Sequence, residues 1–243
     1  MQEASSLYDE AYHDRHHEEL RGWEFKKKTD LIEGCVKGGR LLDVGCGYGY
    51  FQKALGSHWK ATGIDMSPHA AEFGRESLGV DVRCSTFAGL GADAGSFDAV
   101  TLWDVVEHVQ DPVADLRLAY AALRPGGVLG VSTGLISALV PTVAGKFWYF
   151  LNIPDHQFAF NMKWLRNTLD GMGFDVRDVV IHNKGFDFVP SFARRFAVEA
   201  AKWSLGAAWR VTKSGAIERR LKDKAPPLVP MFNDIVMIAA VKR

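Results

Sequence analysis

The sequence lacks an excess of charge of either sign. Its 243 residues carry 29 Lys and Arg against 29 Asp and Glu, so the formal net charge is zero. A protein that binds nucleic acid over its whole surface is usually basic, and this balance argues against that class. Cysteine is also scarce: Cys35, Cys46 and Cys84 show no CxxC spacing, and one of the three must stay unpaired. The sequence therefore predicts neither a disulfide framework nor a zinc site, and it fits a reducing compartment.

The sequence also lacks an apolar leader and an unbroken apolar run. Its opening stretch, MQEASSLYDEAYHDRHHEE, is polar and acidic, which is unlike a secretory signal. Residues 125–145 carry no charge, but Pro125, Pro141 and five glycines interrupt them. A buried strand that leads into a loop explains this pattern better than a transmembrane helix does. We expect a cytoplasmic protein.

After residue 39, short apolar segments alternate with helical patterns. This alternation is typical of βαβ units around a parallel sheet. The predicted strands are 40–44, 60–64, 81–84, 99–103, 128–132, 174–181 and a last one within 234–243, with a turn at 124–127. Helices are predicted to begin at Tyr50, at Ser67-Pro68, at Asp111-Pro112 and after Asn161, because Ser, Asp and Asn cap helices and Pro suits the first position. We expect one domain over residues 1–243.

Two segments flank the predicted core of residues 39–182. Residues 1–38 are charged and helical in pattern and are expected to form an N-terminal cap. Residues 183–233 form an insertion with an apolar stripe at helical spacing and a second side that mixes basic and aromatic residues. We favour a helix packed on two sides, as a lid or a dimer element. The alternative is a peripheral membrane or partner contact through residues 191–224.

The stretch LLDVGCGYGYF, residues 41–51, carries the most specific signal. Gly45, Gly47 and Gly49 follow an apolar strand and precede a helix, so a ligand can approach bare backbone and the helix N-terminus. A dinucleotide fingerprint would need a third glycine at position 50, which is Tyr50. Tyrosine would obstruct the close packing of helix on strand that this glycine permits, so nicotinamide binding is disfavoured.

The loop instead reads Asp-x-Gly-x-Gly-x-Gly from Asp43. With VTLWDVVEHVQDP, LRPGGVLGVST and DHQF…WLRNTLDGMGFDV, the chain resembles the class I S-adenosylmethionine-dependent methyltransferases. The resemblance is to the bacterial small-molecule and glycan-associated branch that includes the ubiquinone-type enzymes, and it spans residues 41–176. It implies a Rossmann-like, doubly wound α/β fold. The sheet would have seven strands, mostly parallel with the last antiparallel, and the cofactor would be S-adenosylmethionine.

The resemblance also implies a set of cofactor-binding residues. Asp65 would accept the ribose hydroxyls, although it could instead cap the helix that begins near Ser67. Asp43 would orient the loop and attract the ammonium group of the cofactor. The other candidates are Gly45, Cys46, Gly47 and Gly49 in the loop, Met66, Thr86 and Phe87 around the adenine, Trp103 and Asp104 near the methionine part, and Tyr12 or Tyr8 at its amino-acid end. Met66, Thr86 and Phe87 are equally explained as core or turn residues, and Cys46 as a filler.

Methyl transfer from a sulfonium is an in-line displacement, so the protein mainly aligns the reacting atoms. An oxygen or nitrogen nucleophile also benefits from a nearby base. His156 matches a histidine of the resembling family and is the preferred base, with a hydrogen-bonded loop histidine as the alternative. His108, beside Glu107, is the second candidate and is expected at the start of the helix after the fourth strand. No metal site is predicted.

The acceptor is the least determined part of the prediction. Thr133-Gly134-Leu135 stands where relatives often have Thr-Pro-Asn in the loop that shapes the acceptor pocket. We expect O-methylation of a small-molecule or glycan-like acceptor and no nucleic-acid partner, with N-methylation as the near alternative. A nicotinamide-dependent oxidoreductase and a non-catalytic binding module on the same scaffold are the alternatives from other classes.

Overall fold

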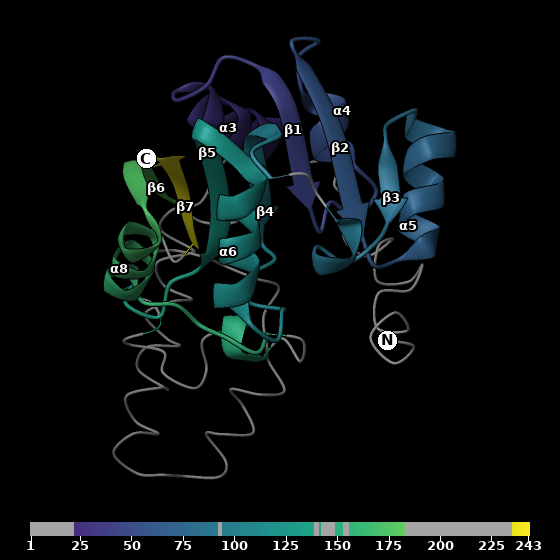
Figure 1. Ribbon diagram of the computed structural model, residues 1–243. Coiled ribbons are helices and arrows are strands. Elements are labelled where there is room, and N and C mark those ends of the chain that lie inside the picture. Colours follow the sequence, from purple (N-terminus) through teal and green to yellow (C-terminus); the bar gives the residue numbers. More distant parts are fainter. Residues whose placement is uncertain (1–21, 92–93, 139–140, 142–148, 153–155, 183–234) are drawn as a thin grey trace, which may run out of the picture.

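The computed structural model describes residues 22–91, 94–138, 141, 149–152, 156–182 and 235–243. They form one seven-stranded sheet with helices on both faces (Figure 1). Tyr8, Tyr12 and the predicted helical stripe within 191–224 lie outside these residues. None of the described helices is long and apolar enough to cross a membrane.

The sheet has the predicted topology. Its strands are β1 (Gly39–Val44), β2 (Trp59–Asp65), β3 (Val82–Cys84), β4 (Phe97–Trp103), β5 (Leu123–Gly134), β6 (Phe174–His182) and β7 (Ile235–Lys242), in the order β3-β2-β1-β4-β5-β7-β6. Strands β1 to β5 pair in parallel, and β7 runs antiparallel between β5 and β6. The strand order reverses between β1 and β4. Ligands of doubly wound sheets bind at such a switch point, beyond the carboxyl ends of the strands.

Strand β5 is longer than predicted at both ends. The expected turn at 124–127 lies inside it as an irregularity, because Phe97 pairs with Leu123 and the register resumes where Ala99 pairs with Val128. Leu123 is fully buried, and its carbonyl accepts a hydrogen bond of 2.7 Å from Lys242 Nζ. Burial and this bond hold the backbone at Leu123 in the sheet, so the Pro-Gly-Gly signal produces a bulge instead of ending the strand.

The described helices are α3 (Gly22–Glu33), α4 (Tyr50–Ala54), α5 (Pro68–Phe73), α6 (Pro112–Ala122) and α8 (Met162–Met172). Helices α5, α6 and α8 begin directly after the residues predicted to cap or precede them, Ser67, Asp111 and Asn161. Ser67 Oγ accepts the Ala70 N–H at 3.2 Å, and Asp111 Oδ1 accepts the Ala114 N–H at 2.9 Å. These bonds satisfy N–H groups that have no partner within the helix. Unlike the single helix that was predicted, α5 passes into a π-helical turn at Gly74–Leu78.

The two faces of the sheet are covered by different helices. On one face, α6 and α8 place Leu116, Leu165 and Leu169 into the larger hydrophobic core. On the other, α3 and α4 place Ile32 and Phe51 in a second core. Buried polar side chains, among them Asp43, Thr101 and Ser132, lie toward the carboxyl ends of the central strands. The candidate site is therefore expected at this edge of the sheet.

Candidate active site

The glycine loop has the conformation that its sequence predicts. Gly45, Gly47 and Gly49 all have positive φ angles, of 65°, 55° and 86°. A Cβ on Gly45 would lie 2.6 Å from Val105 Cγ2, and one on Gly49 would lie 2.7 Å from Gln52 Oε1. The backbone conformation therefore favours glycine at all three positions, and close neighbours add to this at Gly45 and Gly49.

Asp65 ties this loop to the end of β2. Its Oδ2 accepts the Gly47 N–H at 2.9 Å, and its Oδ1 accepts the Ser67 N–H at 2.9 Å. The alternative given by the sequence, a cap near Ser67, is thus part of what Asp65 does. The carboxylate is half-buried and keeps lone pairs beyond these two bonds. Ribose binding by Asp65 stays a prediction.

Asp43 lies below the loop, in the sheet itself. It is 2% exposed, and Thr101 Oγ1 on β4 donates a hydrogen bond of 2.6 Å to its Oδ1. A buried carboxylate at the base of the loop can orient the loop through the backbone. Its attraction for the ammonium group of a cofactor stays a prediction.

The remaining candidates near β2 and β3 divide into exposed and buried side chains. Met66 is 40% exposed, and Thr86 is exposed with its Oγ1 accepting the Gly89 N–H at 3.0 Å. Phe87 is buried in the larger core, which favours the core alternative for this residue. Cys46, within the loop, is buried against Ala71 and Val82, as the filler alternative expects.

Trp103 and Asp104 lie at the carboxyl end of β4. The Trp103 ring is buried and meets Phe51 edge-to-face at 5.8 Å between ring centroids. Asp104 has a φ of 57°, the only positive φ of a non-glycine residue in the described part of the chain. Its N–H lies 2.9 Å from Ser132 Oγ, and the Ser132 hydroxyl lies 3.1 Å from Asp104 Oδ1.

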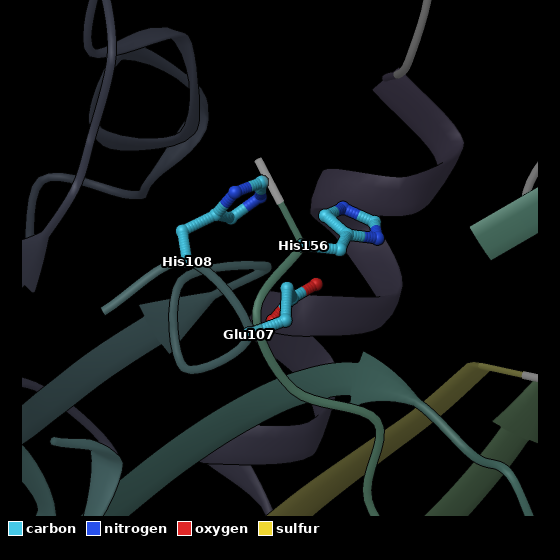
Figure 2. Close-up of side chains that lie close together, drawn as sticks. All are labelled: Glu107, His108 and His156. Atoms are coloured by element: carbon cyan, nitrogen blue, oxygen red, sulfur yellow. The ribbon is translucent and has the colours of Figure 1, made fainter. Parts of the chain in front are cut away.

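A second group of side chains converges at the same edge of the sheet. The side chains of Glu107, His108 and His156 lie close together, and one ligand atom from each lies within 4.8 Å of the others (Figure 2). Glu107 is buried, and the two histidine rings meet edge-to-face at 4.6 Å. Glu107 and His108 lie in the loop between β4 and α6. They precede Pro112, so the expectation that His108 begins the helix is wrong.

Backbone hydrogen bonds hold the two halves of this group together. The Glu107 carbonyl accepts the N–H groups of Gln157 at 2.8 Å and Phe158 at 3.3 Å. His156 Nδ1 lies 2.9 Å from the Phe150 carbonyl oxygen. A carbonyl can only accept, so Nδ1 carries the proton, and in neutral His156 the lone pair is on Nε2. His156 is both a hydrogen-bonded loop histidine and a group with a basic nitrogen.

The same three side chains have the donor set of a metal site. One carboxylate and two imidazoles suit divalent transition metals. A histidine that binds a metal usually donates its other N–H to a carbonyl or carboxylate, as His156 Nδ1 does to Phe150. The expectation of no metal site stays a prediction, and this group is where it can be tested.

Sequence reasoning missed two features of the site. It did not place His156 next to Glu107 and His108, although the two segments follow neighbouring strands, β5 and β4, whose carboxyl ends meet at one edge of the sheet. It did not consider Lys28 of α3, whose side chain is 6% exposed and whose Nζ lies 2.9 Å from Glu24 Oε1. The i, i+4 spacing of Glu24 and Lys28 was the one available signal, and it is common on solvated helices.

Comparison with known proteins also identifies a methyltransferase domain. The family described as a methyltransferase domain matches residues 13–179. A ubiquinone biosynthesis O-methyltransferase of Xanthomonas campestris pv. campestris is 42% identical over 107 residues, which are 40% of this chain and 44% of the relative. One of Xanthomonas axonopodis pv. citri is 41% identical over 161 residues, 58% of this chain and 65% of the relative. The match therefore spans less than two thirds of either relative.

The fold has a solved counterpart. The crystal structure of a SAM-dependent methyltransferase from Archaeoglobus fulgidus superposes with a TM-score of 0.62 at 19% sequence identity. The superposition covers 96% of this chain and 100% of that one. At this identity the likeness concerns the fold, and it agrees with the strand order and the antiparallel β7.

Proposed function

Because the chain belongs to the class I S-adenosylmethionine-dependent methyltransferases, we propose that it methylates a hydroxyl oxygen of a small-molecule acceptor. The observation that carries this proposal is the position of His156, which lies close to Glu107 and His108 at the carboxyl edge of the sheet. Because its Nδ1 donates to the Phe150 carbonyl, neutral His156 has its lone pair on Nε2. Two of its relatives are named O-methyltransferases. A glycan-like acceptor belongs to the same proposal.

The glycine loop and the residues beyond it would hold the cofactor. Its ribose would lie at Asp65, next to the Gly47 backbone that this carboxylate already binds. Met66 is exposed beside this position and offers an apolar surface to the adenine. The methionine part would then reach toward Asp104 at the end of β4, as the order of strands in such folds requires.

The reaction is a displacement at the methyl carbon. A lone pair of the acceptor oxygen forms the new bond to carbon while the carbon–sulfur bond breaks and leaves S-adenosylhomocysteine. The hydroxyl proton passes to His156 Nε2, and the buried carboxylate of Glu107 stabilises the imidazolium that forms. An amine acceptor would lose its proton to the same nitrogen, which keeps N-methylation as the near alternative.

The donor set of the same group favours a second mechanism. A divalent cation held by Glu107, His108 and His156 would polarise an acceptor hydroxyl and lower its pKa. In that mechanism the histidines are ligands and not bases. A chelator separates the two mechanisms, because only the cation-dependent one loses turnover when the metal is removed.

Titration calorimetry with S-adenosylmethionine and S-adenosylhomocysteine tests the family function, and absence of binding by folded protein would refute it. The acceptor is sought by incubating metabolite and glycan extracts with methyl-labelled cofactor. With the acceptor in hand, His156→Ala should lower turnover by about 10²- to 10⁴-fold without changing cofactor affinity if His156 is the base. His58→Ala, an exposed histidine outside this group, is the control.

The chelator experiment then separates base from ligand. If His156 is the base, dialysis against EDTA leaves turnover unchanged. If the group holds a cation, EDTA abolishes turnover and Mg²⁺, Mn²⁺ or Zn²⁺ restores it. Full activity of the His156→Ala and His108→Ala variants, with or without EDTA, would exclude both mechanisms.

A further inference from the structure

We propose that Lys28 of α3 is a positioning residue that orients the carboxylate of Asp104 in the cofactor site. This inference rests on the proposed function, because it takes Asp104 to lie beside the methionine part of S-adenosylmethionine. If Lys28 has this role, α3, a helix outside the βαβ core, contributes a residue to the cofactor site.

Asp104 is held in a conformation that its own backbone disfavours. Its φ of 57° lies in the left-handed region, which non-glycine residues rarely adopt and keep only where the surroundings fix them. Ser132 fixes the main chain, since both its Oγ and its carbonyl oxygen lie within hydrogen-bond reach of the Asp104 N–H, at 2.9 and 3.1 Å. The Ser132 hydroxyl also fixes Asp104 Oδ1 at 3.1 Å.

Lys28 approaches the other oxygen of this carboxylate. Its Nζ lies 3.8 Å from Asp104 Oδ2 and 2.9 Å from Glu24 Oε1, one helical turn earlier. The ammonium group is also 5.5 Å from the centroid of the Trp103 ring, the residue before Asp104. Two elements far apart in the sequence, α3 and β5, therefore hold the two oxygens of one carboxylate.

Stability alone does not account for this arrangement. The side chains of Lys28 and Glu24 are 6% and 2% exposed, so both charges lose most of their hydration on folding. Such pairs often stabilise a protein no better than apolar side chains of similar size. Lys26 and Asp30 on the same helix form an equivalent pair that is 74% and 58% exposed, with no such cost. A buried lysine aimed at a strained aspartate is better explained by orientation of that aspartate.

A double-mutant cycle measured by cofactor binding tests the proposal. The variants are Lys28→Met, Asp104→Asn and the two combined, with Lys28→Arg as the conservative variant and Lys26→Met as the matched control. Calorimetry gives the dissociation constant of S-adenosylmethionine, and thermal melting reports folding separately. If Lys28→Met does not fold, Lys28→Gln takes its place under the same criteria.

If Lys28 acts through Asp104, Lys28→Met weakens cofactor binding roughly tenfold, and in the Asp104→Asn background it has no further effect. Lys28→Arg retains most of the affinity of the parent for S-adenosylmethionine, and Lys26→Met binds it as tightly as the parent does. The proposal is overturned if the fold-loss of affinity in the double variant equals the product of the fold-losses in the two single variants. It is also overturned if Lys28→Met binds S-adenosylmethionine as tightly as the parent. Failure of the parent protein to bind the cofactor would instead refute the proposed function.

Discussion

The backbone N–H of Gly47 donates a hydrogen bond of 2.9 Å to Asp65, so the middle of the glycine loop is anchored to the end of β2. The same carboxylate accepts the N–H of Ser67, the residue that caps α5. A single side chain thus fixes the loop, the strand end and the next helix relative to one another.

Asp65→Ala should weaken S-adenosylmethionine binding by tenfold or more, because hydrogen bonds to a charged group contribute about 1.5–3 kcal/mol each. Both the loop anchor and the proposed ribose contact are lost. Calorimetry measures the affinity. Asp81→Ala is the control, since its carboxylate bonds Thr62 and Arg83 at the β2–β3 edge. Equal affinity of Asp65→Ala and the parent would exclude the ribose role.

Gly49→Ala should destabilise the protein more than Gly79→Ala does. Both residues have positive φ, of 86° and 68°, so each alanine carries a backbone cost of roughly 1–2 kcal/mol. At Gly49 the new Cβ would also lie 2.7 Å from Gln52 Oε1, whereas at Gly79 nothing lies within 4 Å. Urea denaturation compares the two, and equal losses would show that the loop relaxes around the methyl group.

Phe174→Ala should lower the free energy of unfolding by about 3–5 kcal/mol, as for other large-to-small changes in a core. Phe174 is fully buried at the start of β6 and meets Tyr120 edge-to-face at 5.1 Å. Ile181→Ala, on the same strand but 43% exposed, should cost much less. Similar denaturation midpoints for the two variants would contradict this account of the core.

Glu33 should make a pH-dependent contribution to the free energy of unfolding. Its pKa lies below the usual 4.5, first because Trp59 Nε1–H donates to it and then because His58 lies 2.7 Å from the same oxygen. A carboxyl group with a lowered pKa in the folded state stabilises the fold above its unfolded pKa, and this contribution is lost as the pH falls through the folded pKa. Glu33→Gln should therefore destabilise at neutral pH and have little effect in acid.

Urea midpoints measured from pH 7 down to about pH 3 give the test, since ordinary glutamates titrate in this range. The parent and Glu33→Gln curves should converge as the pH falls. Curves that stay parallel would show that the bonds to Trp59 and His58 do not couple the protonation of Glu33 to folding.

Local sequence patterns predicted the helices and strands well where a single signal, such as a capping residue or an apolar run, marked the element. Ser67, Asp111 and Asn161 cap helices as their residue types require, and β1 to β4 end within two residues of the predicted positions. The Pro-Gly-Gly stretch at 125–127 was misread. Its turn chemistry was correct, but burial of Leu123 and its pairing with Phe97 keep the chain in the sheet.

The site was predictable in its parts but not in its assembly. Asp65 and the three glycines follow from local spacing, because a strand, a loop and a helix define them. Glu107, His108 and His156 meet only because a long-range pairing places Gln157 against Glu107. The role of Lys28 could not be predicted from its i, i+4 spacing to Glu24, since only the tertiary fold decides whether a helical lysine is solvated or turned toward a second carboxylate.

The place of β7 in the sheet has a consequence for how the chain is made. Among the described residues it is the last strand in sequence, yet it lies between β5 and β6 and pairs with both. On the ribosome, a chain synthesised only through β6 therefore lacks the strand that joins β5 to β6 in the described sheet, and the edges that β7 would cover are left unpaired by it. Final closure of the sheet must wait for residues 235–242 to emerge, and a stalled or truncated chain would present those edges to other nascent chains.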